Sequence, residues 1–205
     1  ALTPSLATLT GALGSIAVLW GSWQAYKAER LKLLAAYSTI AQLGYLFILV
    51  AVILSLPPGI QRDTAFGALI LFALTHAFAK SALFLSAGII QHHIGHDRID
   101  ELAGTAKTLP LTTFIIAISG VALIGLPPSG SFLAKWHLLS SALYSGQWWW
   151  VTVIAVGSLL AGAYIFRVLG HAFSPQDIEA KVIGMNGEVA PALAMALIAT
   201  LVLGF

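Results

Sequence analysis

Residues 64–91 read TAFGALILFALTHAFAKSALFLSAGIIQ, an apolar run of membrane-spanning length that contains one lysine, Lys80, and no arginine or carboxylate. A transmembrane helix needs about 20 mostly apolar residues to cross a hydrocarbon core roughly 30 Å thick. A β-barrel strand needs only about 9–11 residues of alternating polarity, a pattern that this run does not show. The stretch therefore predicts a membrane-spanning helix, and its lysine requires a separate explanation.

The composition of the whole chain agrees with a bilayer as solvent. Of the 205 residues, 59% are hydrophobic and only 9% are charged, whereas soluble domains carry about 25% charged residues. The chain has no cysteine, which excludes a disulfide framework and a thiolate metal site. A net charge of +2 is too small to indicate a nucleic-acid partner.

Apolar stretches of spanning length recur along the chain, and the fourth of them is interrupted. The six stretches are 3–26, 33–56, 64–91, 109–145, 147–172 and 189–205. The fourth is too long for one crossing and contains GLPPSGS at 125–131, where Gly125, Pro127, Pro128 and Gly130 disfavour a continuous helix. Irregular backbone at membrane depth is tolerated only against protein or a water-filled cavity. Either the helix breaks inside the membrane, or two helices meet in a turn at its surface.

The expected fold class is an all-α polytopic membrane helix bundle with about six transmembrane segments, one of them discontinuous. Most of the basic loop residues fall on one side of the membrane: Lys27, Arg30, Lys32, Arg98, Lys107 and Lys181. Arg62 lies on the other side. The positive-inside rule then predicts that the 27–32 connection faces the cytoplasm or its organellar equivalent.

Two lysines, Lys80 and Lys135, lie inside spans, while all eight acidic residues lie in or beside loops. A basic group at mid-membrane costs about 2.5–3.5 kcal/mol on insertion scales, so such residues usually serve a function. His76 precedes Lys80 by four residues and shares its helix face. Because imidazoles and buried amines can exchange protons, we predict a proton relay of His76, Lys80 and Lys135. Further groups could relay protons or hold water, namely Thr75, Ser81 and His137.

Two alternatives assign these lysines a structural role. Lys80 could pair with a carboxylate of a partner protein as a static assembly contact. Lys135 could extend its amine to the membrane surface from a helix end.

Other motifs carry weaker signals. HHIGH at 92–96 offers imidazoles, but no cysteine or carboxylate completes an obvious metal site and the motif lies at the membrane surface, so we expect no metal. WWW at 148–150 is typical of an aromatic belt at the membrane surface. Because the sequence has no Gly-rich phosphate loop and no catalytic triad, we expect no cofactor and no redox chemistry in this chain.

Three segments resemble one family in order and spacing: KLLAAYSTIAQLGY (32–45), THAFAKSALFLSAGII (75–90) and GLPPSGSFLAKW (125–136). The chain is similar to the antiporter-like subunits of respiratory complex I, photosynthetic NDH complexes, membrane-bound hydrogenases and Mrp-type cation/proton antiporters. That family contains two inverted five-helix repeats, each with a broken helix, and all three segments belong to the second repeat.

The resemblance implies a domain organisation and roles for the embedded residues. Residues 1–172 would form the second half-channel repeat, 173–188 a loop and 189–205 the following transmembrane helix. Lys80 would be the bridging lysine of the central hydrophilic axis, with His76 beside it, and Lys135 the lysine of the exit half-channel.

The chain also departs from the family pattern. The glutamate–lysine pair of the first repeat is missing, and Phe72 stands where many relatives have another histidine. The entry to the second helix usually reads Asp-x-Lys-Arg, whereas residues 30–33 here read RLKL.

The resemblance therefore implies a proton-translocating half-channel subunit of a complex I-like NAD(P)H–quinone oxidoreductase or related redox pump, so that the chain would be part of a translocase. The alternatives are an Mrp-type Na⁺/H⁺ antiporter subunit and a non-conducting structural subunit. The expected partners are lipid, other membrane subunits and protons or Na⁺, without nucleic acid. The expected location is a bacterial or archaeal cytoplasmic membrane or an organellar energy-converting membrane.

Overall fold

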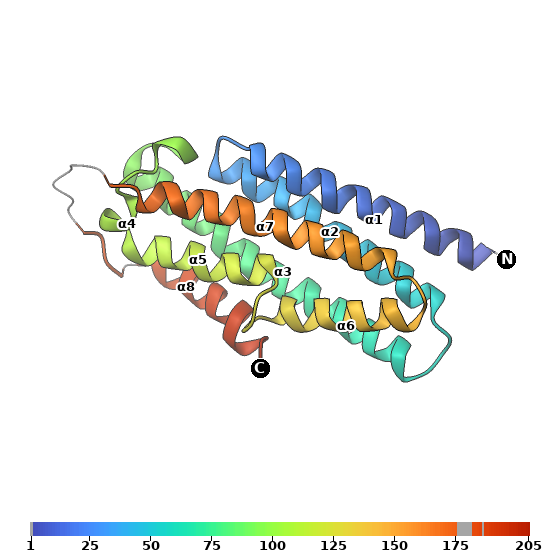
Figure 1. Cartoon of the computed structure of the whole chain (residues 1–205). Coiled ribbons are helices and arrows are strands. Elements are labelled where there is room, and N and C mark those ends of the chain that lie inside the picture. The colour runs from blue at the N-terminus through green and yellow to red at the C-terminus, as the bar shows by residue number, and fades with distance from the viewer. Residues whose placement is uncertain (1, 176–181, 186) are drawn as a thin grey trace.

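The computed structural model describes residues 2–175, 182–185 and 187–205, and every regular element within these ranges is a helix (Figure 1). Lys181 lies outside the described residues. The elements are α1 (Leu2–Lys27), α2 (Leu31–Ser55), α3 (Ile60–Ile94), η1 (Ile99–Glu101), α4 (Thr105–Thr108), α5 (Pro110–Ile124), α6 (Gly130–Tyr144), α7 (Trp149–Phe173), α8 (Val189–Leu197) and the π-helical η2 (Ile198–Val202). The predicted all-α class is confirmed.

Among the described residues, four helices are long and apolar enough to span a membrane: Pro4–Lys27, Leu31–Ser55, Ile60–Ile94 and Trp149–Phe173. A fifth crossing is shared by α5 and α6, and the stretch 189–205 forms the shorter α8 and η2. The predicted number of six segments is therefore approximate. Large apolar side chains such as Ile16, Leu159 and Phe166 are exposed on the outer faces of the bundle, as lipid contact requires.

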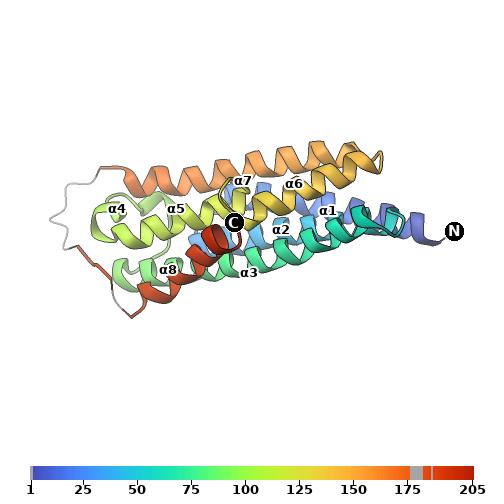
Figure 2. The ribbon, with the colours of Figure 1, turned by 90° about the horizontal axis from the view of Figure 1, so that it is seen from below.

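The bundle is elongated, and its connections gather at two ends (Figure 1). We call one the basic end, which contains the connections at 28–30 and 95–109 and the start of α8. The opposite end contains the connections at 56–59 and 145–148. Figure 2 shows α8 running from the basic end inward along α3, on which it packs.

Small residues let α1 and α2 pack closely. A Cβ added at Gly44 in α2 would lie 2.5 Å from the backbone oxygen of Gly14 in α1. Contacts between helix backbones of this kind replace the hydrophobic driving force that lipid does not provide. Arg167 of α7 fastens the end of α1 by donating hydrogen bonds to the carbonyls of Tyr26 and Ala28.

At the basic end, Asp97 links the connection that follows α3 to the connection that precedes α2. Its carboxylate is buried, accepts a hydrogen bond of 3.2 Å from the backbone N–H of Lys32 and lies 3.9 Å from the Arg30 guanidinium. Its carbonyl accepts a second backbone bond, of 2.9 Å, from Leu31. These contacts satisfy backbone donors in the first turn of α2, which otherwise have no partner in the helix.

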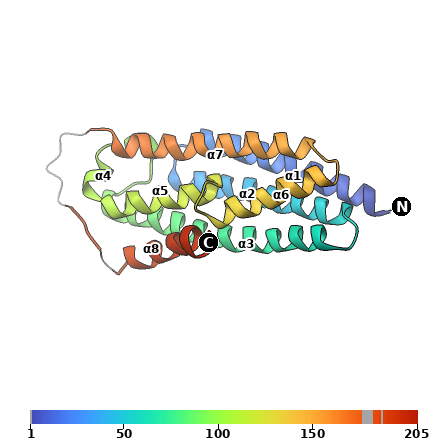
Figure 3. The same cartoon turned by 60° about the horizontal axis from the view of Figure 1, so that its bottom comes forward.

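The GLPPSGS motif breaks one membrane-spanning helix, and the break lies at mid-depth. Figure 3 shows α5 and α6 end to end between α7 and α3, with the break about halfway along both neighbours. Gly125 ends α5 in the left-handed conformation, with φ 82°, and Ser129 caps α6 by accepting a bond of 3.1 Å from the N–H of Phe132. A turn at the membrane surface would lie at one end of the bundle, so the discontinuous helix is confirmed.

Candidate functional site

Lys80 lies in the middle of α3 and is buried, with 6% of its surface exposed. Its amine donates a hydrogen bond of 3.0 Å to the carbonyl of Ala35 in α2, and another to the Ser38 hydroxyl. Ser38 in turn donates to the Leu34 carbonyl at 2.7 Å. The amine therefore has neutral oxygen partners on the neighbouring helix.

Lys135 lies in the second turn of α6, just after the break, and is 5% exposed. Its amine donates to the carbonyl of Ile124 and to the Ser158 hydroxyl of α7, both at 2.9 Å. It also lies 4.3 Å from the ring centroid of Tyr45, a cation–π distance. Because these partners lie at mid-bundle, the predicted alternative of an amine at the membrane surface does not fit this position.

The broken helix supplies the polar partners on the α5 side. Interrupting a helix frees the carbonyls of its last turn. Ile124 offers its carbonyl to Lys135, and Leu123 offers its carbonyl to the Gln42 side chain of α2 at 2.8 Å. Gly125 makes room for this arrangement, since a Cβ there would lie 2.8 Å from Cδ of Lys135.

Polar side chains between the two lysines form one buried row. Ser38 contacts Lys80, and Gln42, one turn later on α2, contacts the carbonyl that precedes the Lys135 acceptor. The Tyr164 hydroxyl of α7 lies beside Ser38 and Gln42, although it makes no hydrogen bond of ordinary length there. The row connects α3, α2, α5 and α6 across the centre of the bundle.

Sequence reasoning missed Ser38, Gln42, Tyr45, Ser158 and Tyr164. A signal was present in AYSTIAQLGY, where Ser38 and Gln42 are four residues apart and share one face of an otherwise apolar helix. Their partners on other helices depend on packing, which this spacing does not reveal.

The other predicted relay residues lie at varying distances from the row. His76 is one turn before Lys80 in α3, and its Nδ1 is buried with no hydrogen-bond partner among the residues that the structure describes. Thr75 donates to the carbonyl of Leu71 at 2.8 Å, and its hydroxyl lies against Gly130 at the break. Ser81 donates to Ala77 at 2.9 Å. His137 is half-buried on α6.

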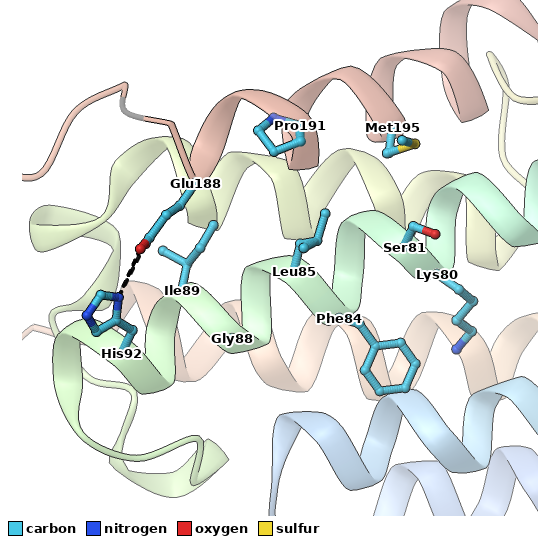
Figure 4. A pocket seen from close by; sticks show the side chains of 10 residues that line it. All are labelled: Lys80, Ser81, Phe84, Leu85, Gly88, Ile89, His92, Glu188, Pro191 and Met195. Carbon is cyan, nitrogen blue, oxygen red and sulfur yellow. Dashed lines mark hydrogen bonds and ion pairs between the residues drawn. The ribbon is translucent and has the colours of Figure 1, made fainter.

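Each lysine lines a different cavity. A groove of about 820 Å³ lies between α3 and α8. Figure 4 shows side chains that line it, with Lys80 at the inner end and His92 and Glu188 at the basic end. A second cavity, of about 220 Å³, lies between α6 and α7 on the opposite half of the bundle. Lys135 and Ser158 line it together with Gly125 and Ile154. The buried row therefore joins cavities on different halves of the bundle.

Carboxylates are distant from both amines. In the described part of the chain, every ion pair lies at the basic end. The acidic members of these pairs are Asp97, Asp100, Glu101 and Glu188. Lys80 and Lys135 have only hydroxyl, carbonyl and aromatic partners within these ranges. An uncompensated charge buried in this way is expensive, which favours an amine that can also lose its proton.

A polytopic bundle that buries lysines beside a broken helix has the architecture that the sequence led us to expect of an antiporter-like membrane subunit. The chain belongs to the family described as "NADH:quinone oxidoreductase/Mrp antiporter, TM", whose family model matches residues 2–161.

Individual relatives agree with this membership. The chain is 36% identical over 174 residues to "NADH-quinone oxidoreductase subunit N" of Desulforudis audaxviator, with 84% of this chain and 32% of the relative covered. It is 28% identical over 204 residues to "NADH-quinone oxidoreductase subunit L" of Escherichia coli, with 98% of this chain and 32% of the relative covered. The chain thus spans about a third of the length of these curated relatives.

Solved structures show the same fold. A chain of the Mrp complex from Dietzia sp. DQ12-45-1b superposes with a TM-score of 0.82 at 25% identity, covering 98% of this chain and 44% of that one. A chain of respiratory complex I from Thermus thermophilus gives the same TM-score at 22% identity, covering 98% and 41%.

Proposed function

We propose that this chain forms one half-channel of a proton-translocating membrane subunit in a complex I-like redox pump. The observation that carries the proposal is the buried row that joins Lys80 to Lys135 and ends in a different cavity at each lysine. Residues 1–172 would constitute one repeat of the family, and the relatives' greater length leaves room for another.

The row can carry protons in steps. A proton would reach Lys80 through the α3–α8 groove and move past Ser38 and Gln42 through intervening water to Lys135. It would leave through the α6–α7 cavity. Two ammonium groups in one low-dielectric network repel each other, so the arrival of a proton at one lysine favours its release from the other.

The remaining parts of the proposed pump would lie outside this chain. The partners would be other membrane subunits, and the driving redox reaction would take place on them. The host membrane would be a bacterial, archaeal or organellar energy-converting membrane, with the basic end facing the cytoplasm or its equivalent.

Antiport of Na⁺ is a second candidate, favoured by the likeness to the Mrp complex chain. A sodium site requires carboxylate or carbonyl oxygens. Two of the carbonyls freed at the break, those of Leu123 and Ile124, already accept from Gln42 and Lys135. Sodium would therefore have to displace one of these side chains or bind elsewhere in the full protein.

The deciding experiment replaces each lysine with methionine, which keeps the length of the side chain and removes its charge. Membrane vesicles containing the assembled complex would be energised with its electron donor, and proton uptake would be followed with a pH-sensitive dye. We expect K80M and K135M to abolish proton uptake while native gels show normal assembly. K107M, which removes an exposed lysine at the basic end, is the matched control.

Two other outcomes would favour the alternative functions. Uptake at the control rate in both variants would contradict proton conduction and favour the non-conducting structural role. Sodium uptake, measured with a radioactive tracer and lost in the same variants, would favour antiport.

A further inference from the structure

Two histidines and a glutamate converge at the basic end. His92 and His93 occupy the last turn of α3, and Glu188 immediately precedes α8. Nδ1 of His92 lies 3.1 Å from Oε1 of Glu188, and Nε2 of His93 lies 3.6 Å from Oε2. The sequence-based argument against a metal was that no cysteine or carboxylate completes an obvious site with HHIGH. The fold supplies one from a residue 96 positions away.

We propose that His92, His93 and Glu188 form a binding site for a divalent transition metal, with Zn²⁺ as its expected occupant. Two imidazoles and a carboxylate are a donor set that zinc accepts, with water completing a four-coordinate site. The donor atoms of all three residues lie within 4.8 Å of one another.

The geometry needs only a small adjustment. Zinc bonds of about 2.0–2.2 Å set tetrahedral donors about 3.4 Å apart. The two histidine–glutamate distances are already near that value. The imidazole rings are stacked with centroids 4.8 Å apart, and both lie at the surface, so rotation of exposed side chains can bring in the remaining donor.

The position of the site means that a bound metal would affect the α3–α8 groove. His92 and Glu188 line the mouth of the α3–α8 groove, and Lys80 lines its inner end (Figure 4). His92 lies twelve positions after Lys80 in the same helix, a path of about 18 Å. A metal held by the last turn of α3 and by the residue that precedes α8 would fix the start of α8 to α3 and obstruct the groove. On the proposed function, bound zinc therefore inhibits proton entry.

The first test is binding. The assembled complex, washed with a mild chelator, would be titrated with ZnCl₂ in equilibrium dialysis, with Co²⁺ as a spectroscopic probe of tetrahedral coordination. We expect H92A/H93A and E188Q to weaken binding at one site per chain by tenfold or more, since even the loss of residues that only orient ligands costs roughly 10–100-fold.

The matched control is H96A, because His96 belongs to the same motif and pairs with Glu101 instead. It should bind zinc like the unsubstituted protein. Equal zinc affinity in H92A/H93A, E188Q and the unsubstituted complex would overturn the metal site. E188Q keeps the shape of the side chain, so it remains informative if the double variant assembles poorly.

The second test is inhibition of proton uptake by ZnCl₂, with each variant compared with its own zinc-free rate. We expect inhibition in the unsubstituted complex and H96A, and its loss in H92A/H93A. Zinc that binds at these residues without slowing uptake would refute the obstruction of the groove. Normal uptake in K80M would instead refute the proton route, and dialysis would still decide the metal site.

Discussion

Replacing Gly125 with alanine should move the Lys135 amine with little effect on the rest of the fold. The added Cβ would lie 2.8 Å from Cδ and 3.2 Å from Nζ of Lys135. Ordinary van der Waals contact begins at 3.4 Å, so the side chain must retreat by about 0.6 Å. That shift moves the two 2.9 Å hydrogen bonds, to Ile124 and Ser158, toward the outer limit of hydrogen bonding.

The substitution should lower the stability of the fold only slightly and the rate of proton uptake strongly. Alanine in the left-handed region costs roughly 1–2 kcal/mol. Moving the flexible end of a lysine adds little to this strain. Hydrogen bonds to a charged group contribute about 1.5–3 kcal/mol each, and about 1.4 kcal/mol corresponds to a tenfold change in rate. Weakening both bonds should therefore lower proton uptake at least tenfold.

Gly146 provides the matched control. It also has a positive φ, 73°, and a Cβ added there meets no atom of the described residues within 4 Å. G125A and G146A should therefore lower the thermal unfolding temperature of the complex by similar amounts, while only G125A slows dye-monitored proton uptake. Equal uptake in the two variants would refute the reasoning that Gly125 positions Lys135.

Two further predictions concern packing and the buried row. G44A should lower the unfolding temperature because its Cβ meets the Gly14 backbone. G67A is the control, because a Cβ added there meets no atom of the described residues within 4 Å. It should leave the unfolding temperature unchanged or raise it slightly through the higher helix propensity of alanine. Q42L should destabilise the complex by about 1–3 kcal/mol, because the Leu123 carbonyl loses its buried donor, and should also slow proton uptake. If Q42L unfolds at the same temperature as the unsubstituted complex, the prediction for Gln42 is wrong.

The sequence predicted those features whose signal is local. Lys80 and Lys135 stand out because charge is costly within apolar spans, and GLPPSGS contains the prolines and glycines that disfavour a continuous helix. The depth of the break was left open, because the same motif suits a turn at the membrane surface. Packing decides it, since Ser158 and Thr75 flank the break from the middle of their helices.

Features that depend on contacts between distant segments could not be predicted. Serine and glutamine in a span are compatible with many neighbours, so Ser38 and Gln42 acquire a role only once α3 and α5 lie against α2. Glu188 is far from HHIGH in the sequence, and only the return of the chain into α8 brings it beside His92.

The break in the α5–α6 helix also places the end of a helix macrodipole inside the membrane. The C-terminus of a helix behaves as roughly half a negative elementary charge. Lys135 contacts this terminus through the Ile124 carbonyl, whereas Lys80 contacts the Ala35 carbonyl in the second turn of α2, far from the C-terminus of that helix. Backbone polarity thus provides Lys135 with a partial counter-charge that Lys80 does not receive from Ala35. The two lysines are therefore unequal sites for a cation, and the proposed relay would pass a proton between sites that the backbone makes unequal.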